Sequence, residues 1–203
     1  MASEGVVHVL DDDEAMRDSL AFLLDCAGLE ARTYDSALAF LERINSLERG
    51  CIVTDIRMPR MSGLELVERL GALGITDPVI VITGHGDVPL AVQAMKAGVS
   101  DFIEKPFSDD QLLSAIRSAL ARGSELREEE QERAAAKARI DALSARERQV
   151  LDGLVEGKPN KIMAFELGIS ARTVEIYRAN LMTKMQAGSL SQLVRMALLA
   201  ARD

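Results

Sequence analysis

The sequence predicts a doubly wound α/β domain, a charged helical linker and a small all-helical domain. Three observations lead to this fold class. Short apolar runs alternate with amphipathic stretches through residues 1–122, as in β-α units around a parallel sheet. A charged stretch without proline follows at 123–139. From residue 140 to residue 203 the apolar periodicity is helical throughout.

Five strands are expected in the first domain, at residues 6–10, 30–34, 51–55, 79–83 and 101–104. The runs at 51–55 and 79–83 are apolar on both faces, which is typical of central parallel strands. Helices are expected at about 14–27, 36–44, 63–72, 88–97 and 109–121. Gly28 and Gly98 can adopt the left-handed conformation that ends a helix. Asp87 followed by Pro89 is typical of a helix start.

The charge of the chain is unevenly distributed. The net charge is −8, but residues 1–122 hold 20 acidic and 11 basic side chains, whereas residues 141–203 hold 7 acidic and 9 basic ones. Such an asymmetry can mark an end that faces nucleic acid. The only cysteines, Cys26 and Cys51, lie in apolar surroundings, and we expect reduced thiols that pack as small core side chains.

The sequence shows no pattern typical of export or membrane insertion. The N-terminus has no basic region followed by a long apolar run, so no signal peptide is expected. No stretch approaches the roughly 18 uncharged apolar residues of a membrane span. The chain is therefore expected to be cytoplasmic, with no membrane partner.

Polar residues stand at the carboxyl ends of four of the five expected strands. They are Asp11, Asp12 and Asp13 after the first strand, Asp55 in the third, Thr83 in the fourth and Lys105 after the fifth. Open parallel sheets bind ligands at this edge, where the strand order reverses. In the order 2-1-3-4-5 the first and third strands are neighbours, so the acidic cluster is expected beside Asp55.

This set of side chains is suited to phosphoryl transfer. Packed carboxylates repel each other unless a cation joins them, and oxygen ligands without Cys or His favour Mg²⁺. Asp55 would be the nucleophile that forms an acyl phosphate, with Thr83 and Lys105 binding phosphoryl oxygens. Each residue alone is a weak signal, because acidic residues after a strand are often helix caps or turn residues. Their joint occurrence at four strand ends favours the site.

Residues 6–122 resemble a response-regulator receiver domain. The resemblance rests on "VLDDDE", "VTDIRMPRMSG", "VITGHGD" and "DFIEKPF". It implies a flavodoxin-like fold and phosphorylation of Asp55 by a partner histidine kinase. It also implies that the chain is not an enzyme beyond its own phosphotransfer and dephosphorylation.

The same resemblance implies roles for individual residues. Mg²⁺, or another divalent cation such as Mn²⁺, would be bound by Asp11, Asp12, Asp55 and the backbone carbonyl of Arg57. Asp13 is not a direct ligand in this family. Thr83 would be the switch hydroxyl, Phe102 the aromatic switch residue and Lys105 the phosphate-binding lysine. The Lys105–Pro106 bond would be cis.

The linker sequence "GSELREEEQERAAAKARIDA" at 123–142 predicts a solvated helical spacer. Helix-forming residues dominate it, and opposite charges recur three or four residues apart. The apolar stripe from the preceding helix fades after Leu126, so a long coiled coil is not expected. Gly123 and Ser124 can break the helix.

The last domain shows the pattern of a helix-turn-helix. Ser144 and Glu147 form a predicted capping box at the start of its first helix. Gly168 can turn the chain between the second and third helices, and Ser170 can cap the third. A fourth helix is expected at 189–201. The apolar contacts expected in the motif are Met163, Leu167, Ile169, Val174 and Tyr177.

Helical geometry divides the third helix into two faces. Val174, Leu181 and Met185 share the face expected in the core. The exposed mixed face suits base edges and the basic flanks suit phosphates. The DNA-binding residues expected are Lys161, Arg172, Thr173, Glu175, Ile176, Arg178, Ala179 and Lys184. Of these, Arg172, Arg178 and Lys184 would meet phosphates, and Glu175, Ile176 and Ala179 would face bases. The pattern alone is equally compatible with a plain helical bundle.

Residues 140–200 resemble the DNA-binding domain of LuxR-type transcription factors, on "LSARERQVL", "GKPNKIMAFELGIS" and "RTVEIYRANLMTKM". With the receiver motifs, the chain resembles two-component response regulators of the FixJ subfamily. This implies a sensor histidine kinase, promoter DNA and RNA polymerase as partners, and a homodimer on phosphorylation.

Two alternatives to a DNA-binding response regulator remain. A phosphatase of the haloacid-dehalogenase type would need a second acid where Arg57 stands. A phosphorylation-controlled module whose last domain binds protein or RNA is disfavoured by the basic flanks and the turn geometry, but only a binding assay excludes it.

Overall fold

A computed structural model describes residues 5–84 and 88–201. The chain forms two compact units, Met1–Leu126 and Arg127–Asp203, and each is described by itself. The helix start expected at Asp87 lies outside the described residues.

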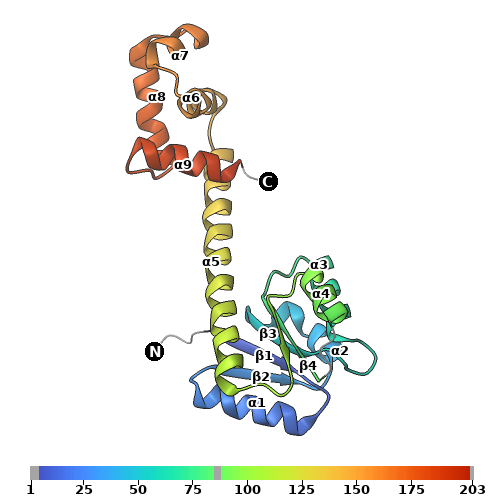
Figure 1. Cartoon of the computed structure of the whole chain (residues 1–203). Helices are drawn as coiled ribbons and strands as arrows, with labels where there is room; N and C mark the ends of the chain where they lie inside the picture. The colour runs from blue at the N-terminus through green and yellow to red at the C-terminus, as the bar shows by residue number, and fades with distance from the viewer. Residues whose placement is uncertain (1–4, 85–87, 202–203) are drawn as a thin grey trace. The chain divides into compact units, whose positions relative to one another are not determined.

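The first unit is built on a parallel sheet of β1 (Val6–Leu10), β2 (Glu30–Tyr34), β3 (Gly50–Asp55), β4 (Val79–Thr83) and β5 (Asp101–Glu104) (Figure 1). The strand order is β2-β1-β3-β4-β5, which confirms the predicted doubly wound topology. The helices are α1 (Glu14–Cys26), α2 (Ala37–Leu41), α3 (Gly63–Ala72), α4 (Val88–Ala97) and the first part of α5 (Asp109–Asp141). Helix α2 is shorter than expected, and a 3₁₀ turn at Ile44–Ser46 follows it.

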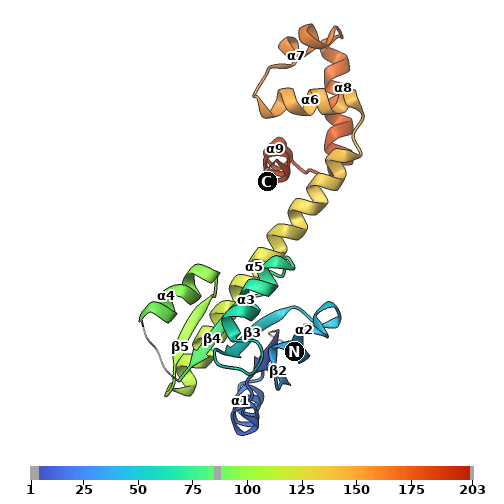
Figure 2. The ribbon, with the colours of Figure 1, turned by 90° about the vertical axis from the view of Figure 1, so that its right-hand side faces the viewer.

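The sheet is covered on both faces, and Figure 2 shows β4 and β5 between helices α4 and α5. Side chains from α2, α3 and α4 pack in one core cluster with Ile52 and Val81. Side chains from α1 and α5 pack on the other face with Cys51 and Val53. Successive residues of a strand point to opposite faces, so burial on both faces explains why the central strands are apolar without alternation.

Glycine and a capping box fix the start of α3 just after β3. The amide of Ser62 donates to Glu65 Oε2 at 2.7 Å, and the Glu65 amide donates to Ser62 Oγ at 3.2 Å. A Cβ atom on Gly63 would lie 2.5 Å from the carbonyl oxygen of Asp55. Only glycine fits this close approach, which holds the chain after Asp55 against the strand end.

The expectation for the cysteines is confirmed for Cys51, which is buried, and is wrong for Cys26, which is exposed. Burial raises the pKa of the Cys51 thiol to about 12. Cys26 is the last residue of α1, whose buried residues are Leu20 and Leu24. A residue two positions after Leu24 lies on nearly the opposite side of the helix, so its thiol points away from the sheet.

Helix α5 runs without a break from Asp109 to Asp141, so Gly123 and Ser124 do not interrupt it. The helical character of the linker is as predicted. The prediction that the whole linker is solvated is wrong near its end, because Ala136, which belongs to the second unit, is only 1% exposed. The domain limits predicted at 122/123 and 139/140 stay predictions.

The second unit contains α6 (Ala145–Val155), α7 (Asn160–Leu167), α8 (Ala171–Lys184) and α9 (Leu190–Ala200) after the end of α5 (Figure 1). The predicted capping box at Ser144 is present, and Gly168 ends α7 at a φ of 66°. Ser170 caps α8 by accepting from the Thr173 amide. No helix within residues 5–84 and 88–201 is long and apolar enough to cross a membrane.

Candidate functional site

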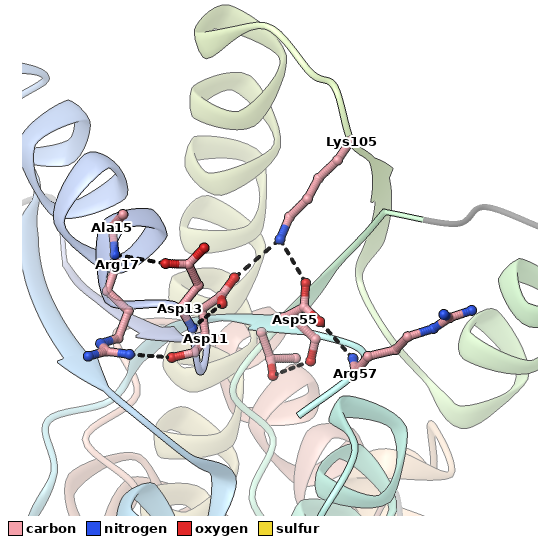
Figure 3. A network of polar contacts seen from close by, with 8 residues as sticks. Asp11, Asp13, Ala15, Arg17, Asp55, Arg57 and Lys105 are labelled. Carbon is pink, nitrogen blue, oxygen red and sulfur yellow. Dashed lines mark hydrogen bonds and ion pairs between the residues drawn. The ribbon is translucent and has the colours of Figure 1, made fainter. Parts of the chain in front are cut away.

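The parallel sheet brings three predicted residues together at its carboxyl edge (Figure 3). Leu10 of β1 is paired with Thr54 of β3, so Asp11 and Asp55 follow neighbouring positions. Lys105 follows β5 and extends towards both carboxylates (Figure 3). The acidic run after β1 and the lysine after β5 therefore meet at one place, as the strand-end pattern predicted.

Lys105 joins the two carboxylates. Its Nζ donates to Asp55 Oδ1 at 2.8 Å and to Asp11 Oδ2 at 3.2 Å. The side chains of Asp11, Asp55 and Lys105 are 6%, 12% and 24% exposed. Two partly desolvated carboxylates repel each other strongly. The shared ammonium offsets this repulsion at the carboxyl edge of the sheet.

Backbone amides hold the remaining carboxylate oxygens. The Asp13 amide donates to Asp11 Oδ1 at 2.9 Å, and the Arg57 amide donates to Asp55 Oδ2 at 2.7 Å. The Asp13 side chain caps α1 by accepting from the Ala15 amide at 2.9 Å. Asp13 is thus a helix cap, whereas both oxygens of Asp11 and of Asp55 have defined donors.

The charge states of Asp11 and Lys105 are shifted by burial and by each other. Burial raises the pKa of Asp11, and the Asp13 amide and Lys105 oppose this rise. Burial acts to lower the pKa of Lys105, but the hydrogen bond and charge of Asp55, together with Asp11, outweigh it and raise that pKa. Lys105 is consequently an ammonium ion at neutral pH.

The two predicted switch residues lie on neighbouring strands. Thr83 ends β4 and is fully buried. Phe102 of β5 is half-buried, is paired with Val81 of β4 and packs against the core cluster that contains α3 and α4. Because Thr83 lies two residues after Val81, Thr83 and Phe102 face the same side of the sheet.

An apolar groove opens beside Lys105. Its volume is about 920 Å³, and it is lined by side chains of α1 and by the segment 105–107. Phe22 on α1 also lines it and is 71% exposed. The groove places apolar surface next to the charged site.

The second unit presents α8 with one buried and one exposed face. Val174, Leu181 and Met185 are fully buried, as predicted. The opposite face carries Glu175, Ala179 and Ile176, the last 55% exposed. An exposed face of mixed chemistry on a helix that follows a tight turn is the arrangement in which a helix-turn-helix reads base edges.

The basic residues near α8 differ in their partners. Lys161 and Arg172 are exposed, and no ion pair or hydrogen bond of their side chains occurs within residues 5–84 and 88–201. The Arg178 guanidinium donates to Asn160 Oδ1 at 2.6 Å, and Lys184 Nζ donates to Glu147 Oε2 at 2.8 Å. Two of the expected phosphate contacts, Arg178 and Lys184, are therefore already bonded within the protein.

Both units match known families. Residues 7–117 match the response regulator receiver domain, and residues 141–197 match bacterial regulatory proteins of the luxR family. The chain is a response regulator with a LuxR-type DNA-binding domain. Phosphorylation and dimerisation are the general mechanism of this family, whose members regulate transcription and are not classical enzymes. The phosphatase alternative is thereby set aside.

Full-length relatives of this response regulator support the assignment. The transcriptional regulatory protein FixJ of Azorhizobium caulinodans is 59% identical over 194 residues, which cover 96% of this chain and 92% of the relative. Full-length FixJ from B. japonicum is similar with 51% identity and a TM-score of 0.63, covering 98% of each chain. The response regulator StyR is 42% identical with a TM-score of 0.84, covering 95% of this chain and 98% of its own.

Receiver domains generally bind Mg²⁺, and the acidic pair of this response regulator fits such an ion. Asp11 and Asp55 converge on one cation, the Lys105 ammonium. One or two carboxylates with water are the ligands that Mg²⁺ usually takes. Asp12 is exposed, and among the described residues no cluster of three or more His, Cys, Asp or Glu side chains is placed to hold a metal. The roles of Asp11, Asp12, Asp55 and the Arg57 carbonyl as metal ligands stay predictions.

The sequence reasoning missed one charged contact of this response regulator. Glu147 was recognised only as part of a capping box, yet its side chain is 5% exposed and bonded to Lys184. The hydrogen bond from Lys184, followed by that from the Ser144 amide, lowers the pKa of Glu147 to about 2. The signal was present, because Glu147 lies three and four residues before Val150 and Leu151, on the apolar face of α6.

Proposed function

We propose that a partner sensor histidine kinase phosphorylates Asp55, and that the phosphorylated chain dimerises and controls transcription at promoter DNA. The single observation that carries this proposal is the Lys105 ammonium bonded to both Asp11 and Asp55 at the carboxyl edge of the sheet. A carboxylate nucleophile beside an ammonium ion is suited to receive a phosphoryl group.

The transfer needs few protein groups. An Asp55 oxygen forms a bond to phosphorus while the bond from phosphorus to the kinase histidine nitrogen breaks, and that nitrogen keeps the electron pair and takes a proton. Lys105 binds one phosphoryl oxygen, and the Thr83 hydroxyl donates to another. A divalent cation, Mg²⁺ or Mn²⁺, would be held by Asp11, Asp12, Asp55 and the Arg57 carbonyl, and it would supply charge neutralisation. Hydrolysis of the acyl phosphate by the chain itself would reset the site.

The groove beside Lys105 is the surface we assign to the kinase. A kinase helix that carries a histidine must approach Asp55 from the solvent-facing edge of the sheet. Phe22 stands exposed on that path and can pack against an apolar side chain of the kinase. Apolar surface next to a charged centre is typical of a transient docking site.

Phosphorylation is coupled to dimerisation through Thr83 and Phe102 in this proposal. Thr83 moves towards the phosphoryl group, and Phe102 moves into the space that it leaves. The surface made by α4, β5 and the first part of α5 then changes and pairs with a second copy. On α4 this surface includes Val92 and Met95, which are 46% and 55% exposed.

Helix α8 is the recognition helix in this proposal. Glu175, Ile176 and Ala179 face base edges, while Lys161, Arg172, Thr173 and Arg178 meet the DNA backbone. Lys184 is left out of these contacts because its ammonium is bonded to Glu147. A pair of such helices in the dimer would match a two-fold DNA site, and RNA polymerase is the expected partner at the promoter.

Substitution of the nucleophile tests the proposal. Asp55→Asn keeps the shape of the side chain but removes the attacking carboxylate. Incubation with labelled acetyl phosphate and Mg²⁺ is expected to label the unaltered chain and leave the variant unlabelled, with the same circular dichroism spectrum. Equal labelling of both proteins would contradict the assignment of Asp55.

A further inference from the structure

The C-terminal end of α8 is tied to the rest of its unit by charged contacts. Lys184, the last residue of α8, donates from Nζ to Glu147 Oε2 at 2.8 Å. Arg139 of α5 donates to Gln186 Oε1 at 2.9 Å and to the Met185 carbonyl at 3.5 Å. Towards its N-terminal end, α8 is held by the Ser170 cap, by the burial of Val174 and by the Arg178 guanidinium, which donates to Asn160 Oδ1 of α7 at 2.6 Å. The C-terminal end of the helix thus has polar anchors of its own, in addition to the core contacts of α8.

Glu147 is a firm anchor because its carboxylate is itself held. Glu147 Oε2 accepts from the Ser144 amide and from Ser144 Oγ, each at 2.8 Å, in addition to Lys184. Its side chain is only 5% exposed, whereas that of Lys184 is 48% exposed. An oxygen with three donors in a buried place leaves Lys184 little freedom of position.

A phosphate contact by Lys184 would conflict with this anchor. If the ammonium left for DNA, Glu147 would remain as a buried carboxylate without its cation, which is costly. If the ammonium stayed, the pair would carry no net charge and would not displace a counterion from DNA. Either way, Lys184 adds little to the charge that neutralises phosphates.

We propose that Glu147 is a positioning residue for DNA recognition. It fixes the C-terminal end of α8 through Lys184, and it removes the Lys184 charge from the set that neutralises DNA phosphates. This assignment replaces the phosphate contact that the basic flank of α8 predicted for Lys184. It rests on the proposed role of α8 as the recognition helix.

The experiment compares the full chain with Lys184→Met, Glu147→Gln and the double variant. Lys184→Met keeps the aliphatic stem and removes the charge. The double variant removes both charges, so it leaves no buried unpaired ion if a single variant folds poorly. Lys161→Met is the matched control, because Lys161 is an exposed lysine of α7 whose side chain has no ion pair or hydrogen bond among the described residues. Circular dichroism verifies the fold of each variant.

Binding is measured at several salt concentrations with two duplexes, one selected by the unaltered chain from a random library and one of random sequence. Lys161→Met is expected to weaken binding to both duplexes alike. The slope of log K against log salt should become shallower by about 0.9. Lys184→Met is expected to leave the slope unchanged, to weaken binding to the selected duplex about 10-fold and to leave binding to the random duplex nearly unaffected. Base readout needs α8 in one exact position, whereas long basic side chains such as Arg172 and Arg178 still reach phosphates after a small displacement of the helix.

Glu147→Gln should reduce the ratio of affinities for the selected and the random duplex as much as Lys184→Met does. In the double variant this ratio should fall no further than in either single variant. A slope lowered by about one in Lys184→Met, with both duplexes weakened alike, would overturn the proposal. Losses that multiply in the double variant would also overturn it, since they would mean that Glu147 and Lys184 act independently.

A measurement without DNA separates this proposal from the proposed function. Amide hydrogen exchange in residues 181–187 is expected to accelerate in Glu147→Gln and Lys184→Met, with residues 171–175 and the Lys161→Met control unchanged. If the unaltered chain selected no duplex, the recognition role of α8 would fail, and this exchange pattern would still decide whether the anchor exists. Unchanged exchange in both variants would show that it does not.

Discussion

Replacement of Lys105 by methionine tests the electrostatic account of the receiver site. The variant leaves Asp11 and Asp55 facing each other without their shared ammonium. Their nearest oxygens lie no more than about 6 Å apart, because they are 3.2 Å and 2.8 Å from the same Nζ atom. Two negative charges at that separation repel by about 0.7 kcal/mol at the dielectric constant of water and by about 3 kcal/mol at an effective constant of about 20. The side chains are mostly buried, so we expect a loss of about 1–3 kcal/mol in the free energy of unfolding at pH 7.

The sign of the pH dependence follows from Asp11. Its pKa is already raised by burial, and loss of Lys105 raises it further. A carboxyl group whose pKa is higher in the folded than in the unfolded state stabilises the fold at pH values below its unfolded-state pKa. This stabilisation is lost as the pH rises through its folded-state pKa. The difference in unfolding free energy between the unaltered chain and Lys105→Met should therefore be small near pH 4 and reach its full size at pH 7.

The assay is urea unfolding followed by NMR amide signals of β1 and β3, which report the first unit alone. It is carried out in EDTA, and then with Mg²⁺, which should restore more stability to Lys105→Met than to the unaltered chain. Lys96→Met on α4 is the matched control, because Lys96 is exposed, and it should change stability by less than about 0.5 kcal/mol. Unchanged stability of Lys105→Met at pH 7, with no pH dependence, would refute the reasoning.

Three further predictions concern Glu147, Gly63 and Phe22. The pKa of Glu147 is lowered to about 2, so the stability that its carboxylate gives the second unit is present above about pH 4.5 and is lost as the pH falls towards 2. Glu147→Gln should therefore flatten the acid unfolding transition measured by circular dichroism. An acid transition identical to that of the unaltered chain would contradict the ion pair. Gly63→Ala would place a Cβ atom 2.5 Å from the carbonyl oxygen of Asp55. We therefore expect the free energy of unfolding to fall by about 2 kcal/mol or more and labelling by acetyl phosphate to weaken. Normal labelling would refute the role of this close approach. Phe22→Ser should reduce phosphotransfer from a kinase that phosphorylates the unaltered chain while transfer from acetyl phosphate stays unchanged; an equal reduction with both donors would argue against docking in the groove.

The sheet and its carboxyl edge were predictable from sequence because their signals are local. Buried parallel strands need continuous apolar runs, and their limits follow from the polar residues that end them. The nearness of Asp11 and Asp55 then follows from the strand order, whereas Lys105 follows β5 and reaches them across β4 with its long side chain. The order came from the doubly wound pattern, so residues 94 positions apart, such as Asp11 and Lys105, could be placed at the same edge of the sheet, but not in direct contact.

Features that depend on tertiary packing were not predictable in the same way. Gly123 lowers helix propensity by about 1 kcal/mol relative to alanine, but strong helix formers on both sides carry α5 through it. The ion pair of Glu147 and Lys184 joins residues 37 positions apart on two helices. Helical periodicity predicts the face on which each residue lies but not its partner on another helix. The sequence therefore predicted that Lys184 contacts DNA phosphates and did not predict its bond to Glu147.

The central claim is that phosphorylation of Asp55 controls assembly of the DNA-binding form. Sedimentation of the full chain with acetyl phosphate and Mg²⁺, beside Asp55→Asn under the same conditions, tests it most directly. We predict that the treated unaltered chain sediments as a dimer and binds its selected duplex more tightly, while the untreated chain and the Asp55→Asn variant remain mostly monomeric. Sedimentation that is identical for treated, untreated and variant chains at all concentrations would contradict the account.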